Sequence, residues 1–109
     1  MPDGFIRLRK GEVRPVYGQE TMLTGSLTIQ GSPAPTVVMT DSSGAVVPGF
    51  NNITASGFDA LPSVAPRVWL NLDTRALLLG YYNLTFTFNA ISSDGGLRIY
   101  RPSLEVQVL

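Results

Sequence analysis

The side chains that most often carry enzyme chemistry are largely missing from this chain of 109 residues. It contains no cysteine and no histidine, which removes thiolate nucleophiles, thiolate zinc sites and the commonest general base. The catalytic groups that remain possible are a pair of carboxylates or a serine activated by a lysine. The one lysine, Lys10, has no serine motif beside it, and the eight acidic residues are scattered singly. The sequence therefore predicts no catalytic residue and a protein that is not an enzyme.

The acidic residues that do stand in a recognisable pattern are Asp41 and Asp94, each in a turn that contains glycine. A short acceptor side chain stabilises the backbone of such turns. Residues 41–44 supply fewer oxygens than calcium requires, so neither a metal site nor a cofactor is predicted. Because the chain carries eight basic and eight acidic residues, nucleic acid is not an expected partner. No apolar run is long enough to span a membrane, and the first residues lack the pattern of a signal peptide.

The elements that would position any site are β-strands. Residues 81–90 alternate apolar and polar side chains with a period of two, and residues 92–96 form a turn. A second strand follows over 97–109, with a bulge or an edge position near Arg101 and Pro102, since proline cannot donate to a ladder. Further strands are predicted over 5–9, 20–30, 36–40, 45–47 and 67–72.

Two segments fit this strand pattern less well. Residues 50–66 are predicted to form a long connection with one short strand, and residues 73–80 a single helical turn. Many short strands with frequent turns are typical of a sandwich. The predicted fold class is therefore all-β: a single immunoglobulin-like β-sandwich over residues 1–109, with about seven short antiparallel strands.

Tyr82 is predicted to be a structural corner residue. In immunoglobulin-type domains, a tyrosine at the start of this strand bonds back across the preceding corner through its hydroxyl group. Tyr82 fits that place, and Leu84 falls where antibody domains carry the second cysteine of their disulfide. The expected role of the hydroxyl is therefore structural.

Protein–protein contact is predicted from the sparse charge. Charged residues make up 15% of the chain, and only Asp41 and Asp59 are charged between positions 21 and 66. Val37, Val38 and Met39 crowd this stretch together with two further valines, more than a small core is expected to bury. Trp69 has the opposite parity to its apolar neighbours, so it either covers an open sheet edge or anchors an interface. These four residues, Trp69, Val37, Val38 and Met39, are the interface candidates.

Several short motifs together resemble the immunoglobulin-like domains of tailed-bacteriophage structural proteins, in particular the N-terminal domain of phage upper baseplate proteins. The motifs are the following: Arg9-Lys10-Gly11-Glu12, Asp73-Thr74, Gly80-Tyr81-Tyr82, Asp94-Gly95 and the β-rich tail 104–109. The likeness covers both ends of the chain, whereas residues 31–66 match no element of that family.

This resemblance implies a non-enzymatic virion structural protein, made in the host cytoplasm and placed in the tail, baseplate, neck or capsid decoration. Its expected partners are copies of itself, through homo-oligomeric contacts, and other virion proteins. The alternative is an immunoglobulin-like binding or spacer module of a bacterial surface protein. Such a module would contact carbohydrate through Trp69 and nearby tyrosines.

Overall fold

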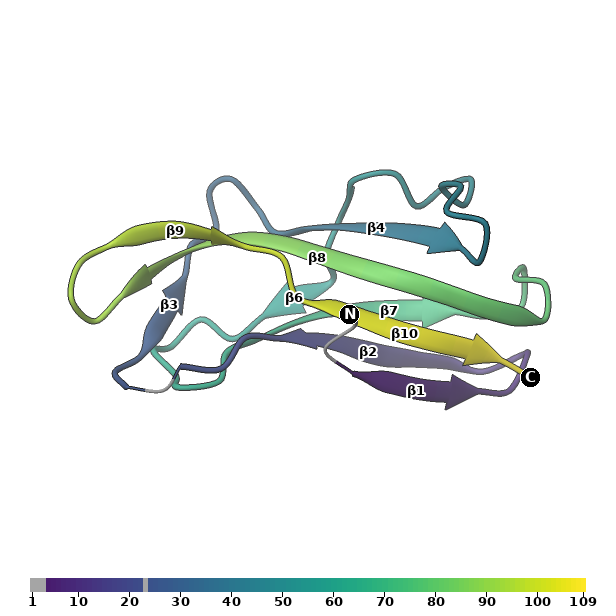
Figure 1. The fold of residues 1–109 in the computed structure, drawn as a ribbon, viewed down its shortest axis with the longest axis horizontal. Helices are drawn as coiled ribbons and strands as arrows, with labels where there is room; N and C mark the ends of the chain where they lie inside the picture. The colour runs from purple at the N-terminus through teal and green to yellow at the C-terminus, as the bar shows by residue number, and fades with distance from the viewer. Residues whose placement is uncertain (1–3, 23) are drawn as a thin grey trace.

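The strands form two packed β-sheets, shown in Figure 1. The computed structural model describes residues 4–22 and 24–109, and within these it contains ten strands and no helix. The strands are β1 (Phe5–Leu8), β2 (Val13–Gln19), β3 (Leu27–Ile29), β4 (Thr36–Asp41), β5 (Ile53–Thr54), β6 (Gly57–Phe58), β7 (Arg67–Asp73), β8 (Gly80–Ser92), β9 (Leu97–Tyr100) and β10 (Ser103–Val108). The predicted all-β, immunoglobulin-like sandwich is confirmed, with ten strands where about seven were expected.

Strand β8 organises the larger sheet. The sheet has seven strands in the order β1-β10-β8-β4-β5, and β3 and β9 flank the far half of β8. The smaller sheet has the order β2-β7-β6. The strand pairs are antiparallel except β1 and β10, which run parallel. The interruption predicted near Arg101 and Pro102 separates β9 from β10, so two short strands follow one another along the same long neighbour.

The core lies between the sheets, where alternate side chains of each strand point inward. Its largest fully buried side chains come from both sheets: Phe86, Phe88, Leu8, Leu27, Met39, Leu72, Leu84, Val16, Val37, Val68, Val106 and Val108. Gly18 of β2 lies directly against the ring of Phe86, so a larger side chain at position 18 would overlap this ring. The close approach of the two sheets at this point depends on a residue without a side chain.

Two of the interface candidates were wrong in their expected exposure. Val37 and Met39 are fully buried in the core, opposite Phe86 and Leu84 of β8. Val38 alone of the three points outward, since β4 alternates between the two faces.

Residues 73–80 form a tight corner between β7 and β8 and contain no helix, unlike the prediction. Asp73 Oδ1 accepts hydrogen bonds from the backbone N–H and the side chain of Arg75. The N–H of Leu77 donates to the carbonyl oxygen of Thr74, which closes a single turn, and the Leu77 side chain is buried. Local hydrogen bonds therefore satisfy backbone groups of the corner, and β8 begins directly after it.

The side chain of Thr74 ties this corner to the turn between β1 and β2. Thr74 is fully buried, and its Oγ1 accepts a hydrogen bond from the N–H of Gly11 at 3.0 Å. The same hydroxyl lies 2.7 Å from the carbonyl oxygen of Glu12 and 3.1 Å from that of Arg9, to which it donates. One hydroxyl thus bonds to three backbone groups of a turn more than sixty residues away.

Candidate functional site

The outer face of the larger sheet carries few charges. Directly paired residues of antiparallel strands share a face, so β4 and β8 together present one continuous uncharged surface. We call this surface the sheet face; its residues are Thr36, Val38, Thr40, Asn83, Thr85, Thr87 and Asn89, all partly exposed. On the same side, Glu105 of β10 and Arg7 of β1 carry charge, and Arg7 bonds to Gln107. The charge-poor surface therefore lies on β4 and β8, away from the β1 edge.

An exposed apolar cluster continues this face at the far end of β8. Ile91 pairs with Leu97, and the next pair along the hairpin is Asn89 with Ile99, so all four lie on the outer side. The exposed fractions of Ile91, Leu97 and Ile99 are 38%, 63% and 56%. The opposite side of the same hairpin is packed, since the rings of Phe88 and Tyr100 stack with centroids 5.7 Å apart. We call Ile91, Leu97 and Ile99 the distal patch.

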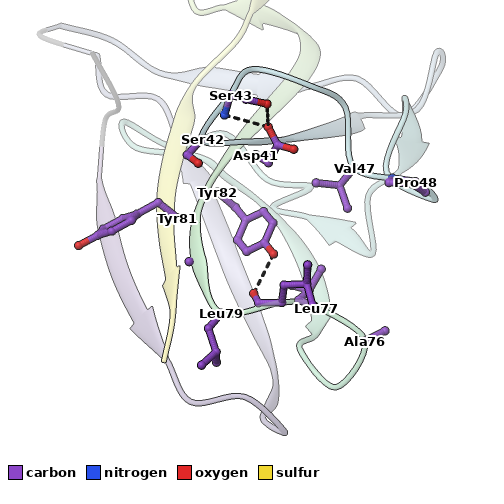
Figure 2. A pocket seen from close by; sticks show the side chains of 12 residues that line it. Asp41, Ser42, Ser43, Val47, Pro48, Ala76, Leu77, Leu79, Tyr81 and Tyr82 are labelled. Carbon is purple, nitrogen blue, oxygen red and sulfur yellow. Dashed lines mark hydrogen bonds between the residues drawn. The ribbon is translucent and has the colours of Figure 1, made fainter.

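A hollow with a volume of about 420 Å³ lies beside the β7–β8 corner. Figure 2 shows it between the turn that follows β4 and the corner, with Tyr82 inside and Tyr81 directed away. The Tyr82 hydroxyl donates a hydrogen bond of 2.8 Å to the carbonyl oxygen of Leu78. The predicted corner role of Tyr82 is therefore confirmed, and this hydroxyl is already engaged within the protein.

Removing that hydroxyl should weaken the fold without emptying the core. We expect Tyr82→Phe to lower the free energy of unfolding by about 1 kcal/mol, because one hydrogen bond is lost while the ring stays. Urea denaturation with matched wild-type protein measures this. Tyr81→Phe is the control, since the Tyr81 side chain points away from the hollow; an equal loss in both variants would contradict the assignment.

The carboxylates beside the hollow and at the hairpin tip hold turns. Asp41 Oδ1 accepts from the side chain and N–H of Ser43 and from the N–H of Ala45, and these bonds, the Ser43 hydroxyl first, lower its pKa. Asp94 accepts from Ser92 Oγ and from the N–H of Gly96, and the Ser92 bond is the main cause of its lowered pKa. The turn roles predicted for both residues are confirmed.

Trp69 lies where its parity predicted, on the outer side of the smaller sheet. It is partly buried and pairs across the ladder with Tyr17 on one side and Gly57 on the other. The Tyr17 and Trp69 ring centroids are 6.1 Å apart, and the Arg67 guanidinium lies 4.8 Å above the Tyr17 ring. The indole therefore covers Gly57 and lies against a tyrosine that is itself stacked by an arginine.

Across 4–22 and 24–109, no three Asp, Glu, His or Cys side chains gather closely enough to hold an ion. Over the same residues, no helix is long and apolar enough to cross a bilayer.

Comparison with known proteins adds little to this geometry. No protein-family model matches the chain, and no curated protein matches it either. Among solved structures, it is similar to CopC from Methylosinus trichosporium OB3b, with 19% identity over 89% of this chain and 95% of that one. The TM-score is 0.39, and a likeness that slight carries no argument about function.

Proposed function

We propose that this chain is a non-enzymatic structural protein of a phage-like particle. It works by assembling in several copies and by contacting neighbouring particle proteins. The sequence resemblance suggests the setting, and the sheet face is the observation that carries the contact role. Two strands in the middle of the larger sheet present seven uncharged side chains outward, one of them the apolar Val38.

A face of this kind is suited to packing against protein. Charged residues are depleted in the centres of protein interfaces because each buried charge must be desolvated. The sheet face offers threonine and asparagine side chains that hydrogen-bond across an interface at a small desolvation cost. Two copies of the chain would pack with their sheet faces together about a twofold axis, the commonest symmetry of homo-oligomers.

The molar mass in solution tests self-association. We expect sedimentation velocity at increasing concentration to give multiples of the 11.7 kDa chain. Thr87→Lys adds a charge to the middle of the sheet face and should weaken association at least tenfold, since an unpaired lysine would be buried. Leu61→Lys adds the same charge in a connecting loop, where the side chain is 78% exposed, and should leave association unchanged.

The particle setting is tested by mass spectrometry of purified particles from cells that make the protein. We expect the chain in them at a fixed, multiple copy number. A protein that stays monomeric at high concentration and is absent from every particle would refute the proposal.

A further inference from the structure

Strand β9 has backbone groups that face away from the sheet. Along β8, the carbonyl oxygen of Asn89 accepts from the N–H of Gln30, on the side away from β9. The N–H of Ser92 instead donates to Gly96, on the hairpin side. Because backbone groups alternate sides along a strand, even-numbered residues of β8 bond β9 and odd-numbered ones do not. Their partners follow the same rule, so the amides and carbonyls of Leu97 and Ile99 point to the outer edge.

Nothing in the described part of the chain covers this edge. Strand β1 lies along β10 and pairs with residues 105–108, as Figure 1 shows, but it does not continue along β9. Strand β9 pairs with β8 alone. Edges of soluble proteins are usually protected by proline, inward charges or a covering segment. Here the four-residue strand ends before Pro102 and is open over its length.

The side chains of β9 define what kind of strand would fit there. Leu97 and Ile99 expose apolar surface on the outer side. Arg98 lies on the other side, opposite Ala90 of β8, and is exposed. Neither Arg98 nor the neighbouring Arg101 forms an ion pair within 4.0 Å with any described residue. The pKa of Asp94 in the adjoining turn is lowered first by its hydrogen bond from Ser92 and, among smaller causes, by the positive charge of Arg98. The edge therefore combines two apolar side chains with positive charge that is not held in an ion pair.

We propose that the β9 edge binds an extended strand of another protein in which apolar and acidic residues alternate. Main-chain hydrogen bonds to Leu97 and Ile99 add this strand to the larger sheet. Its apolar side chains cover the distal patch, and an acidic side chain faces Arg98. In an antiparallel added strand, this acidic residue and Arg98 form a non-hydrogen-bonded pair, in which opposing side chains come closest. The inference rests on the proposed function, since it names a partner for an assembly protein.

A second copy of β9 is a poorer occupant. The register that places Leu97 against Ile99 of a second copy also places Arg98 directly opposite Arg98 of that copy. Like charges opposite one another across a ladder are destabilising. An acidic strand replaces this repulsion with attraction, which is why the occupant is a different chain.

Two synthetic peptides of eight residues test the proposal, one alternating valine with glutamate and the other alternating valine with lysine. Each is titrated into the isotope-labelled protein at low salt, and the amide signals are followed by NMR. We expect the glutamate peptide to shift the Leu97 and Ile99 amides most. Arg98→Glu should weaken its binding about tenfold and give the lysine peptide the advantage. Arg9→Glu makes the same change in net charge on an exposed residue outside β9 and should leave both affinities unchanged.

Each contrary result has a definite meaning. Equal binding of both peptides, or shifts centred on the sheet face, would overturn the acidic partner at the β9 edge. Concentration-dependent shifts of Leu97 and Ile99 in the protein alone would identify a second copy as the occupant and overturn it too. Self-association through the sheet face is measured separately with Thr87→Lys, so a failure of the β9 proposal can be distinguished from a failure of the proposed function.

Discussion

Replacing Gly18 with alanine is expected to destabilise the protein by about 3 kcal/mol, near the upper end of the usual cost of overpacking a core. A Cβ atom at this position would lie 2.6 Å from Cγ and 3.0 Å from Cβ of Phe86. Phe86 is fully buried, so its ring has no open space to move into. Strand β2 would have to move away from β8, which would open the core between the sheets. Urea denaturation of the variant measures the loss.

A second substitution shows whether the Phe86 ring is the cause. Phe86→Ala removes Cγ and the ring, which hold the two atoms nearest to the new Cβ at position 18, so the Gly18→Ala change should cost at least about 1 kcal/mol less in the Phe86→Ala background. Gly31→Ala is the matched control, because the nearest atom to its new Cβ is the tip of the partly exposed Phe58 at 3.3 Å. Additive losses in the double variant would show that the strain lies elsewhere.

Thr74→Val should lower the free energy of unfolding by about 1–3 kcal/mol. Valine keeps the shape of threonine, so no cavity forms, but the N–H of Gly11 loses its acceptor. The carbonyl of Glu12 loses the hydroxyl donor and keeps the hydrogen bond from the backbone N–H of Thr74. Leaving the Gly11 donor unsatisfied costs about 1–3 kcal/mol. Hydrogen exchange adds a local measurement, since the Gly11 amide should exchange faster in the variant.

Thr74→Ser serves as the control for this prediction, because it keeps the hydroxyl and removes one methyl group. It should cost less than the valine variant. If serine were as damaging as valine, packing of the methyl group, and not the hydrogen bonds, would connect the two turns.

Strands that alternate cleanly could be predicted from the sequence, and those that rely on contacts with other strands could not. The period of two in β8, the turn residues Asp41 and Asp94 and the corner tyrosine all act through neighbours in the chain. Strand β2 was missed because Pro15 and Gly18 break its pattern. Both are tolerated for tertiary reasons: β2 is an edge strand, and Gly18 fits beneath the Phe86 ring.

The candidate surfaces show the same division. Sparse charge indicated a contact role, but it could not tell which valines point outward, and the assignment of Val37 and Met39 to an interface was wrong. In the sequence, Leu97 and Ile99 are at odd-numbered positions, whereas the apolar residues Leu104, Val106 and Val108 of β10 are at even-numbered ones. The exposure of Leu97 and Ile99 depends on where β1 ends along the sheet, and no local pattern encodes that.

The parallel pairing of β1 with β10 determines how the protein responds to mechanical load. The two strands run in the same direction, and four residues of β1 pair in register with residues 105–108. A pull on the start of β1 and on the end of β10 therefore acts along the strands in opposite directions. Under such shear, the hydrogen bonds between the strands bear the force together instead of opening one after another. A domain stretched between these two ends would give way abruptly and at high force.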